Sequence, residues 1–137
     1  MKTLIPAFIF LSLFFINTTK SYAQFSSVKE TKDFCINALK NNNIDKFVST
    51  FSNPIEISLP DEENSYSKVQ ATMVIRKFLT TNKVESFKLK QSGKSTGGSE
   101  FIIGNLKSTN GKEYQIYFLF TMTDNKAFLH LIEFELL

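Results

Sequence analysis

The chain has 137 residues, of which 42% are hydrophobic and 14% aromatic, with 16 basic and 13 acidic side chains, one cysteine and one histidine. A single arginine and dispersed lysines form no basic patch, so neither nucleic acid nor an anionic membrane surface is an expected partner. One cysteine cannot form an internal disulfide, and one histidine argues against metal sites built from several imidazoles. This length suits one small domain that is stabilised by packing.

The first residues have the pattern of a secretory signal. Lys2 precedes an apolar run over residues 4–16, and small residues stand at the −3 and −1 positions of a cleavage site after Ala23. The run of 13 residues is shorter than the roughly 20 that a membrane-spanning helix needs, and no cysteine follows it closely enough to carry a lipid. We therefore expect residues 1–23 to be a signal peptide. Residues 24–137 are expected to form a single α+β domain, periplasmic or secreted, without a membrane anchor.

Three amphipathic helices are predicted next. Ser27 and Ser67 are each followed three residues later by Glu or Gln, which is the pattern of a capping box, and Asn43 can cap a shorter helix between them. Apolar residues then recur at three-and-four spacing after each cap, and Cys35 falls among them as an expected buried side chain. The predicted helices cover residues 27–40, about 44–51 and about 67–81.

Strands are predicted where the apolar period changes to two. Residues 55–59 alternate between two prolines and predict a short strand. Residues 61–64, three carboxylates followed by an asparagine, lack calcium-loop spacing and are interpreted as a solvated turn. From Val84 onward the alternation continues to the end of the chain, interrupted by Asn110-Gly111 and Asp124-Asn125, which favour hairpin turns. The expected antiparallel meander has strands at residues 84–92, 100–109, 113–123 and 126–136.

The register of this meander depends on the two turns. If both are two-residue loops, Thr109 pairs with Lys112 and Thr123 pairs with Lys126. The face toward the helices would then carry Phe101, Ile103, Ile116, Phe118, Phe120, Met122, Leu129 and Leu131. The outer face would carry Ile102, Gly104, Leu106, Gln115, Tyr117, Leu119, Thr121, Phe128, His130, Ile132 and Phe134. A β-bulge would exchange the faces beyond it, and Gly104 is the expected position for one.

The outer face is too apolar to lie against water, so it is expected to be a dimer interface or a ligand surface. A homodimer is favoured because two-fold self-association is the commonest oligomer. The candidate ligand or interface residues are Tyr117, Thr121, His130 and Ile132. His130 is expected to be an interface or edge histidine with one hydrogen bond; the alternatives are a general base and a pH-sensitive dimer switch.

Two stretches carry a resemblance to a known family. These are NNNIDKFVSTFSNPIEISLPDEENSYSKVQATMVIRKFLTTNK and TNGKEYQIYFLF. They resemble domain-of-unknown-function family 4783, small secreted bacterial proteins of the nuclear-transport-factor-two-like (cystatin-like) superfamily. The resemblance implies a cone-shaped fold with three N-terminal helices on a curved, mostly antiparallel sheet. It implies no activity or catalytic set, although the superfamily includes enzymes with a pocket between helices and sheet.

Three functions therefore remain open. We expect an exported, non-enzymatic domain that dimerises or binds a partner through the outer sheet face. The alternatives are a carrier of a small apolar ligand and, less favoured, an enzyme, both using the helix-to-sheet pocket. No catalytic residue, metal ligand or cofactor is predicted, and a pocket filled by Phe51, Phe78, Phe118 and Phe120 would argue against both alternatives.

Overall fold

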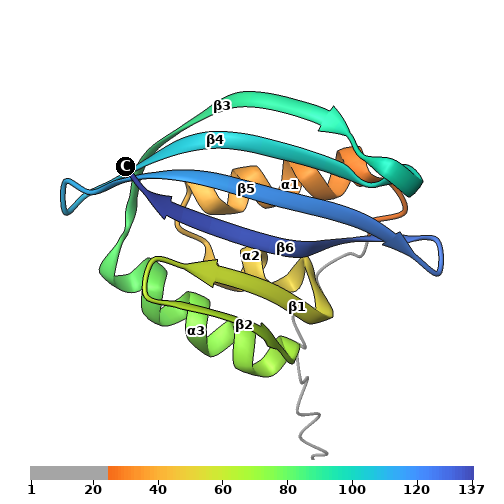
Figure 1. Ribbon diagram of the computed structural model, residues 1–137, viewed down its shortest axis with the longest axis horizontal. Coiled ribbons are helices and arrows are strands. Elements are labelled where there is room, and N and C mark those ends of the chain that lie inside the picture. The colour runs from red at the N-terminus through yellow and green to blue at the C-terminus, as the bar shows by residue number, and fades with distance from the viewer. Residues whose placement is uncertain (1–24) are drawn as a thin grey trace, which may run out of the picture.

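The computed structural model describes residues 25–137, which form three helices on one face of a six-stranded sheet (Figure 1). The predicted signal peptide and its cleavage site lie outside the described residues. No helix within residues 25–137 is long and apolar enough to cross a membrane. In chain order the elements are α1 (Val28–Lys40), α2 (Ile44–Ser49), β1 (Phe51–Leu59), β2 (Glu62–Tyr66), α3 (Lys68–Thr81), β3 (Val84–Lys94), the 3₁₀ turn η1 (Thr96–Gly98), β4 (Glu100–Ser108), β5 (Glu113–Thr123) and β6 (Lys126–Leu136).

The helices begin at the predicted caps. The hydroxyl of Ser27 accepts a hydrogen bond from the third residue of α1, and Asn43 accepts one from the Lys46 N–H at 3.1 Å. At α3 both halves of the capping box are present, because Ser67 and Gln70 bond to each other's backbone N–H groups. These bonds satisfy N–H groups that have no partner inside the helix.

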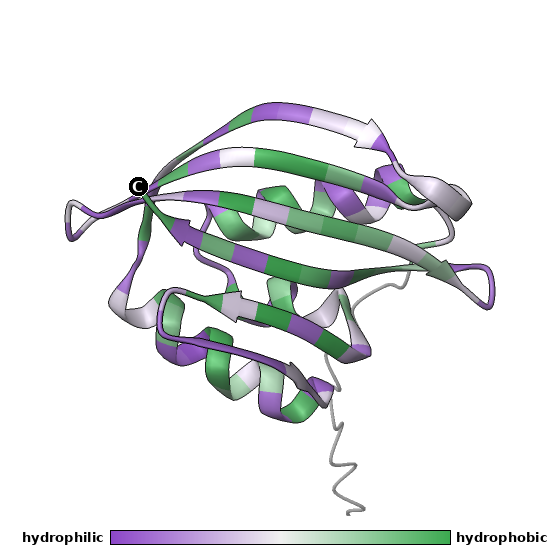
Figure 2. Ribbon diagram, in the orientation of Figure 1, coloured by the Kyte–Doolittle hydropathy of each residue, from purple (hydrophilic) through white to green (hydrophobic). Residues whose placement is uncertain are grey.

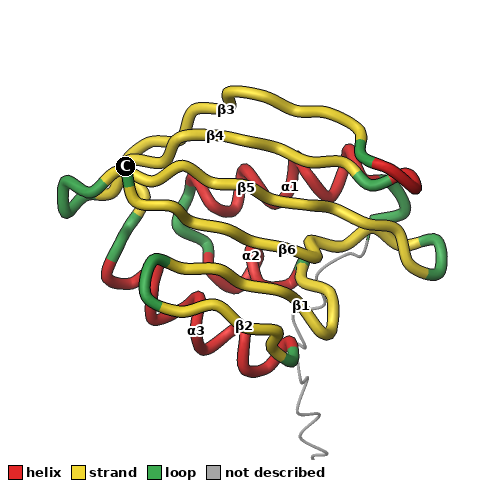
Figure 3. The backbone as a smooth tube through the Cα atoms, viewed as in Figure 1, coloured by secondary structure: helices red, strands yellow, loops and turns green. Residues whose placement is uncertain are grey.

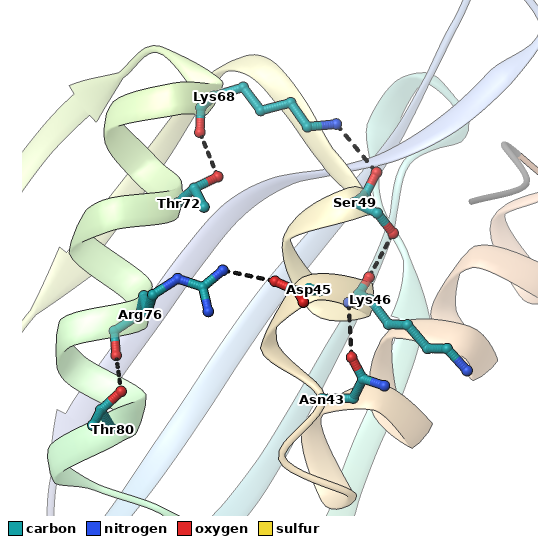
Figure 4. Close-up of polar contacts among 8 residues, drawn as sticks. All are labelled: Asn43, Asp45, Lys46, Ser49, Lys68, Thr72, Arg76 and Thr80. Atoms are coloured by element: carbon teal, nitrogen blue, oxygen red, sulfur yellow. Dashed lines mark hydrogen bonds and ion pairs between the residues drawn. The ribbon is translucent and has the colours of Figure 1, made fainter. Parts of the chain in front are cut away.

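The helices α2 and α3 also contact each other through side chains (Figure 4). Arg76 Nη2 donates to Asp45 Oδ1 at 2.7 Å, and Lys68 Nζ donates to the Ser49 carbonyl at 3.2 Å. The helix α2 ends at Ser49, earlier than expected, because the chain enters β1 at Phe51. These contacts link the two helices across the hairpin that separates them in sequence.

The sheet order is β2-β1-β6-β5-β4-β3, with all neighbours antiparallel except β1 and β6, which are parallel. The α+β class, the four-stranded meander and a strand between the second and third helices are as predicted, but that strand, β1, is longer than expected and is followed by β2, so a hairpin separates α2 from α3. The interpretation of residues 61–64 as a solvated turn is wrong in part, since β2 begins at Glu62. Its side chains are mostly exposed at the sheet edge, so its sequence carries no apolar alternation.

The predicted register is confirmed at one hairpin and wrong at the other. Thr123 pairs with Lys126 across a two-residue turn, as predicted. At the β4–β5 hairpin, Lys107 pairs with Glu113 and the Ser108 N–H donates to the Lys112 carbonyl, so the loop is residues 109–111 (loops in Figure 3). Gly111 occupies the left-handed region at φ 88° and completes this longer loop. A shift of one residue moves every side chain of β4 to the opposite face. Phe101 and Ile103 consequently point away from the helices, while Ile102 and Leu106 are buried beneath them.

A β-bulge lies in β6 rather than at the predicted position. Phe120 pairs with Leu129 and Leu119 with Leu131, which leaves His130 as the extra residue. Beyond it, Ile132 is buried in the core with 0% exposure instead of lying on the outer face. Gly104 pairs with Ile116 of β5 and Leu89 of β3, and the irregularity beside it lies in β3, where Lys90 is an extra residue. The glycine also makes room for a ring, because a Cβ there would lie 2.6 Å from the Phe87 Cζ atom.

Aromatic rings fill the space between the helices and the sheet. The Phe47 centroid lies 5.3 Å from that of Phe51 and 5.8 Å from that of Phe118, and all three side chains are at most 1% exposed. Phe120 is also fully buried. Phe78 is half-buried, and its ring centroid lies 4.8 Å from that of Phe134. Hydrophobic residues dominate the central strands and polar residues dominate β2 (Figure 2). The interior of the cone is therefore packed with hydrocarbon.

Candidate functional site

The outer face of the meander is the face away from the three described helices (Figure 1), and it carries half-buried apolar side chains. Phe101 pairs with Leu119, which pairs with Leu131, so the three side chains form a row across β4, β5 and β6. The Tyr117 ring stacks on that of Phe101, with centroids 5.8 Å apart and planes 18° from parallel. Each of these side chains is only half-buried. We call the following half-buried residues the outer patch: Phe101, Ile103, Tyr117, Leu119, Phe128 and Leu131.

A glycine on the neighbouring strand positions this patch. Gly93 in β3 pairs with Phe101, and a Cβ at Gly93 would lie 2.8 Å from the Phe101 ring. The missing side chain lets the ring lie over the β3 backbone, beside Tyr117. The predicted register places Phe101, Ile103 and Leu131 on the helix face, which is wrong for all three. A glycine at the end of a three-residue loop is the signal that could correct β4, while Leu131 changes face because of the bulge at His130.

Three of the four predicted candidates lie on the outer face. Tyr117 and Thr121 are half-buried in β5, and His130 is half-buried at the bulge. Ser52 Oγ donates its only proton to the Pro54 carbonyl at 2.7 Å. The same Oγ lies 3.1 Å from His130 Nδ1, so in this second hydrogen bond Nδ1 donates and Ser52 Oγ accepts. The fourth candidate, Ile132, is fully buried, so its predicted placement on the outer face is wrong.

A hollow of about 450 Å³ adjoins the outer patch where β2, β1 and β6 run side by side. The carboxylates of Glu56, Glu63 and Glu133 belong to its lining, together with Leu131 from the patch. The lining thus combines apolar residues with three glutamates and with neutral polar residues, which are Ser58, Asn64 and Ser65. Among residues 25–137 no group of three His, Cys, Asp or Glu side chains is arranged to hold a metal ion.

A second hollow of about 440 Å³ lies at one end of the cone, between α3 and the ends of β5 and β6. Its apolar lining includes Leu59, Val74 and Phe78, and lysines and carboxylates stand among its polar lining residues. The Tyr114 hydroxyl donates to Asn82 Oδ1 at 2.8 Å, which satisfies both groups. Burial, aided by the Asp61 carboxylate, raises the pKa of Tyr114 above its ordinary value. This hollow can accept a small apolar group against Leu59, Val74 and Phe78, with charged side chains in the rest of its lining.

The packed interior contains little acid–base chemistry. Within the described part of the chain, the buried polar side chains are Thr31, Thr50, Asn82 and Ser108, with no buried Asp, Glu, Lys, Arg or His. Cys35 is fully buried as predicted, and this burial raises the pKa of its thiol, an effect that the Thr50 hydroxyl opposes in part. A buried neutral thiol is a poor nucleophile.

The arrangement of three helices on a curved six-stranded sheet defines an α+β fold of the nuclear-transport-factor-two-like class. An NTF2-like protein of unknown function from Cytophaga hutchinsonii shares it with a TM-score of 0.59 and 12% identity, over 86% of this chain and 94% of that chain. More narrowly, residues 33–135 match the family described as domain of unknown function DUF4783, and the chain belongs to that family. The predicted family resemblance is thereby confirmed.

Solved structures of the same family agree with this assignment. A DUF4783 family protein from Bacteroides ovatus is 24% identical, with a TM-score of 0.69, over 76% of this chain and 93% of that chain. Another from Bacteroides uniformis is 22% identical, with a TM-score of 0.71, over 77% and 95% of the two chains. These likenesses establish a common fold. No curated protein matches the sequence.

Proposed function

We propose that the protein is an exported, non-enzymatic domain that dimerises or binds a protein partner through the outer patch. The observation that carries the proposal is a row of half-buried apolar side chains on the sheet face opposite the three described helices. Export is supported by the signal pattern of residues 1–23.

Exposure of this apolar face to water is energetically unfavourable. Monomeric proteins rarely expose contiguous apolar patches beyond a few hundred Å² without a functional reason. Aromatic and aliphatic side chains surrounded by polar groups are typical of interfaces, and Tyr117 with its stacked Phe101 partner provides a rigid centre. The filled interior supports this surface over a pocket as the place of function.

Multi-angle light scattering of residues 24–137 at tens of micromolar tests the proposal. The wild-type protein should have twice the mass of one chain, and Tyr117→Lys should be monomeric because it places a charge in the centre of the patch. Met73→Lys is the matched control, since Met73 is an apolar side chain of α3 with 68% exposure outside the patch. A monomeric wild type would contradict self-association, and a Tyr117→Lys variant that keeps the wild-type mass would contradict self-association through the outer patch.

A second candidate function is the carriage of a small apolar ligand in the hollow at the end of the cone. Its volume of about 440 Å³ is within the range of ligand sites, whose lower limit is roughly 300 Å³. Native mass spectrometry of the protein purified from its host should then detect a bound small molecule that Val74→Trp displaces. The control Val69→Trp alters a 75% exposed position on α3 and should retain the ligand. Protein without a bound molecule would exclude the carrier.

A further inference from the structure

Acidic side chains gather on one side of the outer face. Glu56 in β1 pairs with Leu131 of the outer patch, and Ser58, two residues further along the same face, pairs with both Glu133 and Glu63. These three glutamates are exposed and line the same hollow. In β6 the next residue on that face is Glu135, which is exposed and pairs with Gln115. Carboxylates therefore dominate the β2–β1–β6 side of the face, and Lys126, which pairs with Thr123, lies at the other end of β6 beside the β5–β6 turn.

Lysines gather on the opposite side. Lys88 in β3 pairs with Asn105, which lies two residues beyond Ile103 on the outer face of β4. A register shift between Leu89 and Gln91 leaves Lys90 as an extra residue next to the one that pairs with Ile103. Both lysines are exposed. Lys107 is also on this side, but its Nζ lies 3.6 Å from Glu85 Oε2, and this carboxylate balances its charge. The unbalanced positive charge on this side therefore comes from Lys88 and Lys90.

The two charged sides flank the apolar centre. The sheet order puts β1 two strands from β5 on one side and β3 two strands from β5 on the other. Neighbouring strands are about 4.8 Å apart, so β1 and β3 each lie roughly 10 Å from β5, while Glu133 and Glu135 lie on β6, one strand from it. The outer face is thus a stripe of apolar side chains with carboxylates along one border and lysines along the other.

Resting on the proposed function, we propose that the partner on the outer patch is a second copy, related by a two-fold axis parallel to β5. Such an axis turns the two faces toward each other and exchanges their sides, so the lysines of β3 in each copy lie over the acidic hollow of the other. A two-fold axis across the strands would instead place lysines over lysines and carboxylates over carboxylates. Like charges opposite one another disfavour that arrangement, so charge fixes the orientation.

The acidic hollow suits long basic side chains. A lysine can lay its aliphatic stem along apolar surface such as Leu131 while its ammonium group reaches Glu56 or Glu133. Exposed pairs of this kind contribute little to stability on their own. Their effect is on which orientation forms and on how fast the copies meet, while the outer patch provides the buried area.

The test is a charge-swapped chain that carries Glu56→Lys, Glu133→Lys, Lys88→Glu and Lys90→Glu. Its composition and net charge equal those of the wild type, and all four positions are exposed, so the fold should be retained. In the proposed orientation, wild type and swapped chain each form homodimers, because carboxylates face ammonium groups at the four swapped positions in both, while Glu63 and Glu135 are the same in both chains. At those four positions a mixed dimer places like charges opposite each other at both borders, so it should be disfavoured at least about tenfold.

Native mass spectrometry measures the mixed dimer when the swapped chain is labelled with ¹⁵N. Few mixed dimers at low salt, and statistical mixing in 1 M NaCl where the screening length is roughly 3 Å, would support the proposal. Statistical or preferential mixing at low salt would overturn the orientation while leaving dimerisation intact. A monomeric wild type would overturn the proposed self-association itself, so the two failures are distinguishable.

Discussion

Phe118 offers a quantitative test of the filled interior. Its side chain is fully buried, with its ring centroid 5.8 Å from that of Phe47 and 5.9 Å from that of Phe134. Phe118→Ala removes a ring that the surrounding strands and helices can replace only in part, and such substitutions cost about 3–5 kcal/mol. A domain of this size has a free energy of unfolding of roughly 5–15 kcal/mol, so a large share should be lost.

Urea unfolding followed by circular dichroism measures this loss. The Tyr117→Lys background keeps the protein monomeric, so that association does not add to the apparent stability. Phe128→Ala is the matched control, because Phe128 is half-buried on the outer face and should cost about 1 kcal/mol or less. A loss below about 1 kcal/mol for Phe118→Ala would refute the tight packing and favour an open pocket.

Three further predictions follow from packing, burial and the signal pattern. Gly104→Ala should lower the free energy of unfolding by about 1–3 kcal/mol, because the new Cβ would lie 2.6 Å from the Phe87 ring, and Phe87→Leu should restore part of the loss in urea titrations. Stability should fall as the pH rises above 9.0, since burial raises the pKa of Cys35 above that ordinary value and the unfolded chain releases the thiol proton first. Urea midpoints should therefore fall less steeply with pH in Cys35→Ala, and an equal slope would contradict this. N-terminal sequencing of the protein recovered outside the cytoplasm should begin at Gln24, and an intact Met1 would exclude cleavage.

The helices could be predicted from the sequence because their signals are local. A cap such as Ser67 and the apolar positions that follow it lie within one or two turns of the helix. The β1–β2 hairpin could be predicted only in part, because the exposed strand Glu62–Tyr66 pairs through its backbone and has no apolar alternation. Edge strands of this kind leave little trace in a sequence.

The outer patch was harder to predict because it depends on single residues in the register. Asn110-Gly111 is compatible with loops of two and of three residues, and the difference decides which face Phe101 occupies. The bulge at His130 has no local signal in the sequence, because it depends on how β6 pairs with two other strands, β5 and the parallel strand β1. Tyr117 was assigned to the correct face because it lies between these two irregularities.

The segregation of charge across the outer face could not be read from the sequence at all. Glu56 and Glu133 are far apart in the chain and lie on neighbouring strands only because β1 pairs with β6 in parallel. Lys88 reaches the opposite border through the antiparallel order of the meander. Strand order is a long-range property, so the borders of the patch become visible only in the folded protein.

The most direct test of the central claim is the solution mass of residues 24–137, measured by sedimentation velocity over a dilution series with Tyr117→Lys alongside. The wild type should have twice the mass of one chain and should dissociate on dilution. The Tyr117→Lys variant should have the mass of one chain at every concentration. A wild type that remains a single chain at tens of micromolar, or a variant that behaves as the wild type does, would contradict the assignment of the outer patch as the self-association surface.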